Sequence, residues 1–271
     1  MPNWLGDSVM AVGALRALSK DFKVYLLGKP WLGELFYGED FYQGVYPFRH
    51  IFSCPPVKET GLLLPNSFSS ALNFTLCGVR RRVGYSRDMR GPLLTDRVPW
   101  ERKHQVLQYL RLAEYLTGRE LKPEVRLTPP SQEKEIDVVL IPGGSKASKR
   151  WPPEKYRELG KALREKRRSV LYVGSPKEKE LLQEASDNLP YSTPSILDLK
   201  DILARAKIVC GNDTGPIHLA DALGTTVLSL FGGVTHPELT APWNQRENII
   251  RRKNIREITV QEVLEKLLDL L

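Results

Sequence analysis

The chain has 271 residues, enough for one large domain or two domains of ordinary size. Hydrophobic residues make up 41% of it and charged residues 27%, a composition that supports a packed core and argues against disorder. No apolar run approaches the roughly 18 residues of a membrane span, and the opening stretch MPNWLGDSVM lacks the pattern of a secretion signal. We therefore expect a cytoplasmic protein whose three cysteines, Cys54, Cys77 and Cys210, are reduced and mostly buried.

The net charge of +8 is unevenly distributed along the chain. Eight basic and three acidic residues lie between Arg80 and Lys103, which gives this segment alone a charge of +5. Such a concentration of positive charge suggests an anionic partner: a phosphorylated substrate, an acidic membrane face or nucleic acid. A solvated basic face without a partner explains the charge equally well.

Two short apolar segments, residues 22–27 and 61–65, are the strands that we predict in the first half of the chain. The polar stretch 121–135 follows, and its three prolines are typical of a linker. We therefore predict two domains, residues 1–131 and residues 132–271.

In the second half, apolar runs alternate with segments of helical periodicity. The predicted strands are residues 136–142, 169–174, 206–210 and 225–232, and the predicted helices between them are residues 153–166, 177–186 and 216–224. Because these runs are apolar throughout, they indicate strands buried on both faces of a parallel, doubly wound sheet in an α/β protein. A capping box formed by Thr259 and Glu262 predicts a last helix over residues 259–271.

Several common nucleotide and metal motifs are absent from the sequence. It contains no G-x-G-x-x-G turn and no G-x-x-x-x-G-K-[ST] loop, which argues against a standard dinucleotide-binding turn and a P-loop NTPase. No two aspartates stand two residues apart, so the D-x-D pair of many metal-dependent sugar-nucleotide transferases is missing. The four histidines show no H-x-x-x-H spacing. We expect neither a metal nor another cofactor.

The loop 142–151 follows a predicted strand, at the edge of the sheet where ligands bind in open α/β proteins. Gly144 lets the backbone approach a ligand, and Ser145 offers a hydroxyl. Positive charge is supplied by Lys146, Lys149 and Arg150. This chemistry suits a phosphate ester. A flexible surface loop with accidental lysines is an equally open interpretation.

A second loop follows the next predicted strand and contains Glu178, which can bond a ribose hydroxyl. However, Ser175 and Glu178 also fit a capping box with proline at the first helical position. Taken by itself, this structural interpretation is the stronger one.

The stretch GNDTGPIHLADALG, residues 211–224, predicts a helix with an unusual start. Asp213 or Thr214 would cap it, Gly215 would leave room for a ligand at the backbone, and His218 would donate to a phosphate oxygen. Free amides and the helix dipole make such a tip an anion site. The alternative, a plain cap with a satisfied histidine, does not explain why Gly215 is followed by Pro216.

Near the start of the chain, Asp7 precedes a predicted helix and is expected to be its N-cap. A carboxylate at a helix N-terminus has a lowered pKa, which weakens it as a base. It can still accept a proton late in a reaction whose transition state is cationic.

Five stretches of the chain, in this order, resemble the ADP-heptose:lipopolysaccharide heptosyltransferases of glycosyltransferase family 9. They are residues 3–10, 64–72, 82–90, 142–152 and 211–224, and the forms NWLGD and LPNSFSSAL look more like heptosyltransferase II than heptosyltransferase I. The resemblance implies a GT-B fold, with two Rossmann-like domains that face a cleft, the acceptor in the N-terminal domain and the donor in the C-terminal one. It implies an inverting transfer of L-glycero-D-manno-heptose from ADP-heptose to the inner core of lipopolysaccharide, with no essential metal.

The resemblance also implies roles for single residues. Asp7 matches the catalytic base of the family, Lys149 a lysine near the donor phosphates with Ser145 beside it, and Glu178 the acid that holds the ribose. The donor-binding signature D-[ST]-G-x-x-H matches Asp213, Thr214, Gly215 and His218. The basic segment, with Arg87 and Arg90, would meet the phosphates and acidic sugars of the acceptor or the anionic face of a membrane, where the protein would be peripheral.

Some questions stay open at this point. Relatives normally carry a short strand ahead of the Gly-Asp motif, and this chain begins almost at that motif, so the first strand is either abbreviated or trimmed. The last helix, residues 259–271, either stays with the C-terminal domain or crosses back to the N-terminal one. Two other functions remain: a different nucleotide-sugar-dependent glycosyltransferase of the same fold, and a basic nucleic-acid-binding protein. The latter would interleave aromatic with basic residues on one sheet face, a pattern that this sequence lacks, so we expect no nucleic-acid partner.

Overall fold

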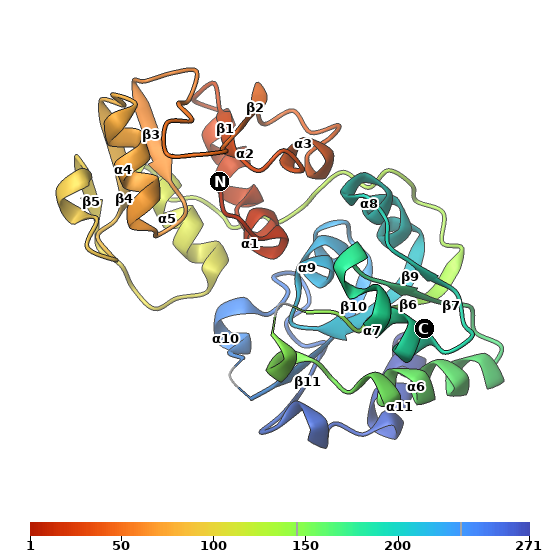
Figure 1. Cartoon of the computed structure of the whole chain (residues 1–271). Helices are drawn as coiled ribbons and strands as arrows, with labels where there is room; N and C mark the ends of the chain where they lie inside the picture. Colours follow the sequence, from red (N-terminus) through yellow and green to blue (C-terminus); the bar gives the residue numbers. More distant parts are fainter. Residues whose placement is uncertain (145, 234) are drawn as a thin grey trace. The chain divides into compact units, whose positions relative to one another are not determined.

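The computed structural model describes residues 1–144, 146–233 and 235–271 (Figure 1). These residues divide into two compact units, Met1–Leu127 and Thr128–Leu271. The division falls close to the predicted boundary after residue 131. The binding roles that we expect of the two halves stay predictions.

The C-terminal unit is built on one six-stranded parallel sheet with the order β11-β10-β9-β6-β7-β8. Its strands are β6 (Ile136–Ile141), β7 (Val170–Val173), β8 (Tyr191–Ser192), β9 (Ala206–Asn212), β10 (Thr226–Gly232) and β11 (Ile249–Arg252). The four strands predicted from continuous apolar runs are confirmed, and the two edge strands, β8 and β11, are additions. The chain first runs outward from β6 to β8, then returns to the centre and runs from β9 to the opposite edge. The order therefore reverses between β6 and β9, which defines a topological switch point.

Helices cover this sheet. The helices of the described residues in this unit are α6 (Pro153–Glu165), α7 (Lys179–Ser186), α8 (Ile196–Arg205), α9 (Gly215–Ala222), α10 (Pro237–Thr240) and α11 (Val260–Leu270), with 3-10 turns η2 (Ala147–Lys149), η3 (Pro176–Glu178) and η4 (Ile255–Glu257). Alternate strand residues, such as Val138 and Leu140, form one core with α6, α7 and α11. The helices α8 and α9 pack on each other and against β9. The predicted doubly wound arrangement is confirmed.

The last helix, α11, packs in the core of the C-terminal unit. One face of α11 packs in the same core as α6. It carries Val263, Leu264 and Leu267, whose spacing places them on the same side of the helix. The hydroxyl of Thr259 caps α11 by accepting from the amide of Glu262 at 3.2 Å. The carboxylate of Glu262 pairs with Arg252.

The N-terminal unit contains two separate parallel sheets rather than one. The strands β1 (Tyr25–Gly28) and β2 (Gly44–Pro47) form the first, and β3 (Thr60–Leu63), β4 (Arg81–Tyr85) and β5 (Asp96–Val98) form the second. The accompanying helices are α1 (Leu5–Met10), α2 (Val12–Ser19), α3 (Leu32–Leu35), α4 (Phe68–Leu76), α5 (Gln105–Thr117) and the turn η1 (Gly91–Leu93). Both predicted strands exist here, with bounds shifted by a few residues.

The cysteines differ from the prediction of three reduced thiols. Cys54 and Cys77 form a disulfide, which joins the chain ahead of β3 to the C-terminal end of α4. The amide of Asn73, on α4, also donates to the carbonyl of Ser53 at 3.2 Å, so the same loop is held by two contacts. Their sequence separation of 23 does not predict this bridge, because it is the turn from β3 into α4 that brings the two cysteines together. Cys210 is a buried free thiol whose pKa is raised by burial.

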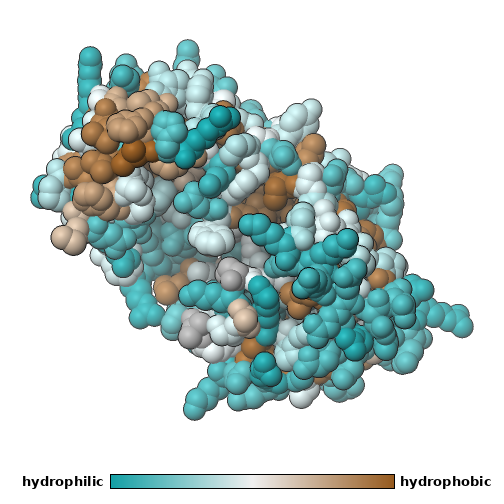
Figure 2. All heavy atoms as spheres, in the orientation of Figure 1, coloured by the Kyte–Doolittle hydropathy of each residue, from teal (hydrophilic) through white to brown (hydrophobic). Residues whose placement is uncertain are grey.

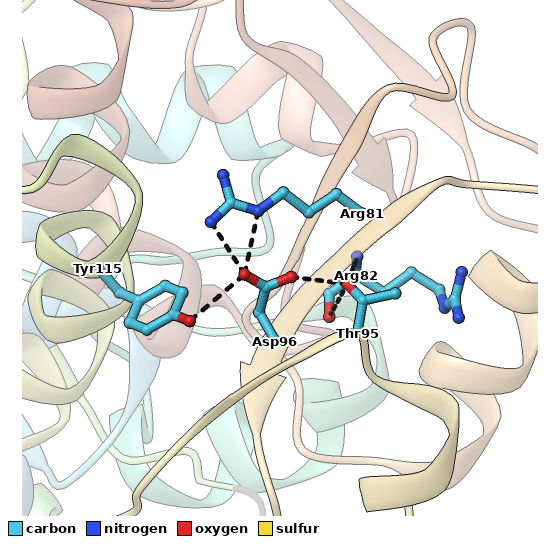
Figure 3. Close-up of polar contacts among 5 residues, drawn as sticks. All are labelled: Arg81, Arg82, Thr95, Asp96 and Tyr115. Atoms are coloured by element: carbon cyan, nitrogen blue, oxygen red, sulfur yellow. Dashed lines mark hydrogen bonds and ion pairs between the residues drawn. The ribbon is translucent and has the colours of Figure 1, made fainter.

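Much of the basic segment 80–103 is occupied within the fold (Figure 3). Arg81, on β4, binds Asp96 of β5 through its Nε and Nη2 atoms at 3.1 and 2.9 Å, and the hydroxyl of Tyr115 donates to the same oxygen. The bonds from Arg81 and Thr95 hold the pKa of Asp96 below its ordinary value. Arg82 donates to the carbonyls of Leu93 and Val79. These arginines use their donors within their own chain, so fewer donors are available to an anionic partner than the sequence suggests.

The surface of the N-terminal unit carries a hydrophobic patch. On the face shown in Figure 2, hydrophobic residues gather where Figure 1 places α4 and β3. Phe68 and Leu76, eight positions apart on α4, are 47% and 51% exposed. In the described ranges, none of the helices combines the length and apolar character that crossing a membrane requires.

Candidate functional site

Three loops at the carboxyl edge of the six-stranded sheet carry most of the predicted site residues. They follow β6, β7 and β9 and begin at Pro142, Gly174 and Asp213. The loops after β6 and β9 flank the switch point, where helices diverge to opposite faces of a sheet and leave a crevice for a ligand. The structure therefore brings together residues that lie up to about seventy positions apart in the sequence. Ser145 lies outside the described residues.

Asn212, the last residue of β9, ties two of these loops together. Its Nδ2 donates to the carbonyls of Pro142 and Gly143, both at 2.9 Å. Its Oδ1 accepts from the amide of Trp151 at 2.9 Å and from the hydroxyl of Tyr156 at 3.2 Å. The side chain is fully buried and uses both donors and the acceptor. The path of the loop after β6 is thus fixed by one amide.

Lys149 and Asp213 meet across the switch point. Lys149 Nζ lies 2.8 Å from Asp213 Oδ2, and His218 Nε2 lies 3.8 Å from Asp213 Oδ1. Burial would raise the pKa of the Asp213 carboxyl, but His218 and Lys149 together outweigh it and hold the pKa below its ordinary value. Asp213 is therefore ionised at neutral pH, and its carboxylate holds the ammonium group of Lys149 in place.

The start of α9 differs from the prediction that Asp213 or Thr214 caps it. Thr214 is the N-cap residue, but its side chain makes no capping bond, and the carboxylate of Asp213 is directed to Lys149 and His218 instead. The first helical residues are Gly215 and Pro216, and proline has no amide hydrogen to satisfy. A helix tip without a side-chain cap, next to an ammonium group, favours an anion.

Glu178 forms the capping box that the sequence predicts, and it also binds the loop after β6. Its Oε2 accepts from the amide and the hydroxyl of Ser175 at 2.9 and 2.7 Å, and its Oε1 accepts from the amide of Gly144 at 2.9 Å. Burial raises the pKa of this carboxyl, but these bonds and the nearby Arg150 bring it below its ordinary value. A Cβ atom on Gly143 would lie 2.4 Å from Oε1, so any other residue there would displace the Glu178 carboxylate. Glu178 thereby fixes the loop after β6 from the other side.

Two described residues that support this site, Asn212 and Trp151, were not among the predicted ones, whereas Arg150 was predicted as a positive charge of the loop. Arg150 Nε donates to the carbonyl of Gly144 at 2.8 Å, and the indole of Trp151 is fully buried and donates to the carbonyl of Ile258 at 3.0 Å. The one sequence signal available was Asn212 itself, a polar residue that ends an otherwise apolar strand.

Asp7 lies in the N-terminal unit, in the first turn of α1, and is not its N-cap as predicted. The helix begins at Leu5, and Trp4 occupies the N-cap position without a side-chain bond. The hydroxyl of Tyr109, on α5, donates to Asp7 Oδ1 at 3.3 Å. Burial and the charge of Asp7 raise the pKa of Tyr109 well above its ordinary value, so this hydroxyl stays protonated as a donor. The carboxylate is therefore oriented from a neighbouring helix.

Of the two arginines expected to bind an acceptor, Arg90 does not fit that role. Its side chain is fully buried, with Nε donating to the carbonyl of Tyr85 at 2.8 Å, Nη2 to Asn66 Oδ1 at 3.0 Å and Nη1 to the carbonyl of Pro65. Burial lowers its pKa to about 10. Arg87 is exposed and its guanidinium stacks 4.0 Å from the centre of the Trp100 ring.

These features define a class of protein. A parallel sheet with this order, an ammonium group and an uncapped helix tip at its switch point is the arrangement of proteins that bind nucleotides or other phosphate esters. Among the described residues, no three His, Cys, Asp or Glu side chains are grouped so as to hold a metal ion.

Residues 58–267 match glycosyltransferase family 9 (heptosyltransferase), and the chain belongs to this family of glycosyltransferases. It is 29% identical to lipopolysaccharide heptosyltransferase 2 of Escherichia coli K12, over 79% of this chain and 75% of that protein. Two solved structures share its GT-B type fold. They are E. coli ADP-heptose LPS heptosyltransferase II, with a TM-score of 0.81, 24% identity and coverage of 99% and 96% of the two chains, and E. coli heptosyltransferase WaaC with ADP, with 0.84, 17%, 98% and 97%.

Proposed function

We propose that this protein transfers L-glycero-D-manno-heptose from ADP-heptose to the inner core of lipopolysaccharide, with inversion at the anomeric carbon. The observation that carries the proposal is the Lys149–Asp213 pair beside the uncapped tip of α9, in a chain of glycosyltransferase family 9. The E. coli relatives are named as heptosyltransferases, and one of them was solved with ADP.

In this reaction the acceptor hydroxyl oxygen forms a bond to the anomeric carbon while the bond from that carbon to the phosphate oxygen breaks. The electron pair of the broken bond stays on ADP, and the hydroxyl proton goes to the carboxylate of Asp7. Lys149 and the α9 amides would stabilise the negative charge that develops on ADP. The Asp7 carboxylate would also favour the cationic sugar of the transition state.

Glu178 is proposed to hold the ribose. An ionised carboxylate offers about four acceptor positions, and three are used by Ser175 and Gly144. One position is therefore left for a sugar hydroxyl. The donor site would be completed by Gly144, Thr214, Gly215 and His218. Of the two arginines that we predicted to contact the acceptor, Arg87 remains a candidate.

Peripheral attachment to an anionic membrane face is part of the proposal. The exposed side chains of Phe68 and Leu76 on α4 supply apolar area, and the exposed Arg80 follows the end of that helix. The nucleic-acid-binding alternative is weakened, because Arg81, Arg82 and Arg90 use their donors within their own chain.

The proposal is tested by incubating the protein with ADP-heptose and heptose-deficient lipopolysaccharide and weighing the product. We expect the mass of one heptose to be added, and the same assay with ADP-glucose to give little product. Efficient transfer from another nucleotide sugar, with none from ADP-heptose, would support the alternative transferase of the same fold.

Paired variants assign the roles. Lys149→Ala should weaken ADP binding at least about tenfold, the effect of one lost charge-assisted contact, whereas Lys146→Ala, an exposed lysine of the same loop, should not. Asp7→Ala should lower turnover by about a hundredfold or more with unchanged ADP affinity. Asp40→Ala removes a carboxylate that is 94% exposed in the same unit and is the control. Normal turnover of Asp7→Ala would rule out its role as the base.

A further inference from the structure

Tyr109 is a buried phenol in the middle of α5, a helix that packs on α1. Its hydroxyl donates to Asp7 Oδ1 at 3.3 Å. The reaction proposed above gives this hydroxyl no part. A phenylalanine would fill the same apolar space, so the polar group at this position has to be explained by what it binds.

A second hydrogen bond orients the hydroxyl of Tyr109. The side chain of Gln105, four residues earlier and therefore on the same face of α5, bonds to it. Burial and the charge of Asp7 raise the pKa of Tyr109, whereas the bond from Gln105 lowers it, as a donor to the phenol oxygen does. The oxygen thus accepts from Gln105, and its own hydrogen is directed to Asp7.

The turn of α5 that carries Tyr109 is held in place by the neighbouring residue, Gln108. The carbonyl of Gln108 accepts from the buried hydroxyl of Tyr85, on β4, at 2.6 Å. Its side-chain amide donates to the carbonyl of Lys103 at 2.9 Å and accepts from the indole of Trp100, also at 2.9 Å. The phenol of Tyr109 therefore projects from a helix that is anchored to the three-stranded sheet.

The same turn is connected to the arginine that is proposed to contact the acceptor. The guanidinium of Arg87 stacks 4.0 Å from the centre of the Trp100 ring, and the indole of Trp100 binds Gln108. Arg87 and Asp7 are thus held through adjacent residues of one helix. A general base must lie within hydrogen-bond reach of the hydroxyl that it deprotonates, so a fixed relation between base and acceptor contact is what the transfer would require.

We infer that Tyr109 is a positioning residue of the transferase, which holds one oxygen of Asp7 so that the carboxylate keeps the orientation in which it accepts the acceptor proton. Gln105 supports it by fixing the phenol. The inference rests on the proposed role of Asp7 as the base. It adds two residues of α5 to the machinery of the reaction, although neither of them touches the reacting atoms.

The test compares two tyrosine variants of the full chain. Tyr109→Phe removes only the hydroxyl and should lower kcat for heptose transfer about tenfold or more, the effect of one lost hydrogen bond to a charged group. The KM for ADP-heptose and the affinity for ADP should not change, because other residues bind the donor. The control is Tyr115→Phe, since Tyr115 lies on the same helix and donates to Asp96 at the same distance of 3.3 Å (Figure 3). Parent-like kcat in Tyr109→Phe, or an equal fall in both variants, would overturn the inference.

Two further variants show whether Tyr109 acts through Asp7. On the background of Asp7→Ala, Tyr109→Phe should leave the residual turnover unchanged, and a further fall there would contradict the inference. Gln105→Met keeps the length of the side chain but removes the donor to the phenol. It should lower kcat about fivefold, as the loss of one neutral hydrogen bond does, with unchanged ADP affinity. If Tyr109→Phe fails to fold, parent-like kcat in Gln105→Met overturns the inference instead.

A measurement without turnover separates this inference from the proposed function. The NMR signal of the Asp7 carboxyl carbon is assigned by its absence in Asp7→Ala. Its chemical shift should change in Tyr109→Phe and stay the same in Tyr115→Phe. If the parent protein transfers no heptose, the proposed function fails, and the chemical shift still decides whether Tyr109 holds the carboxylate. If the parent transfers heptose and the shift does not respond to Tyr109→Phe, the positioning role fails alone.

Discussion

The ammonium group of Lys149 and the carboxylate of Asp213 lie 2.8 Å apart at the switch point of the C-terminal sheet. Their side chains are 22% and 6% exposed, so water screens the pair only partly. Asp213 fixes the position of the lysine before a ligand arrives. An incoming diphosphate would then share an ammonium group that is already oriented, which reduces the entropy lost on binding.

Replacing Lys149 by alanine should change how the protein responds to acid. The folded-state pKa of Asp213 is lowered, so its contribution to stability is present above the unfolded value of 3.8 and is lost as the pH falls through the lowered one. Without the lysine that pKa rises, and the loss begins at a higher pH. We expect Lys149→Ala to cost about 2 kcal/mol near neutral pH, measured by urea unfolding across a pH series. Lys146→Ala should follow the parent protein throughout.

Asn212→Ala should destabilise the C-terminal unit strongly. The change leaves the carbonyls of Pro142 and Gly143 and the amide of Trp151 without their bonds, at a cost of about 3 kcal/mol. Asn188→Ala removes an exposed asparagine of the same unit and should stay within about 0.5 kcal/mol of the parent. Urea melts of both variants would decide this. A loss below that of Asn188→Ala would show that the loop does not depend on Asn212.

Variants of the capping box can separate a structural from a ligand-binding role of Glu178. Ser175→Ala removes the hydroxyl that accepts from the Glu178 amide and donates to Glu178 Oε2, with an expected cost of about 1 kcal/mol and no change in ADP affinity. Glu178→Gln also turns an acceptor oxygen into a donor next to an N–H group, so both stability and ADP affinity should fall. Calorimetric titration with ADP measures the difference. If both variants bind ADP like the parent, Glu178 is a cap alone.

The Met1 amine should make stability depend on pH. Its pKa is about 5 in the folded chain against 8.0 as the ordinary value, so between these values the unfolded chain binds the extra proton and stability rises with pH. The rise amounts to about 4 kcal/mol at most. Acetylating the amine removes the charge, so the difference in unfolding free energy between free and acetylated chains should shrink from pH 5 to pH 8. Lys23 and Glu59 line the same cavity as Met1. They are present in both forms, so their charges do not contribute to the difference between the two unfolding free energies.

The parallel sheet of the C-terminal unit could be predicted because its central strands are apolar throughout. The edge strands escaped prediction for physical reasons: β8 has only two residues, and half of β11 is arginine. In the N-terminal unit, β4 begins within the basic segment 80–103. It was not predicted as a strand because its first two residues are arginines, which break the apolar pattern. Its arginines are paired or buried by contacts with β5, α5 and distant carbonyls, which no local pattern contains.

The site residues could be chosen from loops that follow strands, since the topology of a parallel sheet brings those loops to one edge. What each side chain does there was less predictable. Asp213 or Thr214 was expected to cap α9, but the carboxylate of Asp213 binds the ammonium group of Lys149 instead of the backbone amides. Asp7 was expected ahead of its helix, but the helix begins two residues earlier, at Leu5.

The bridge between Cys54 and Cys77 encloses β3 and the whole of α4 in a covalent ring. By chain entropy alone, a ring of this size adds about 3 kcal/mol to the unfolding free energy. That addition belongs to the N-terminal unit, since the C-terminal unit contains only Cys210. Dithiothreitol would therefore lower the melting temperature of the N-terminal unit and leave that of the C-terminal unit unchanged.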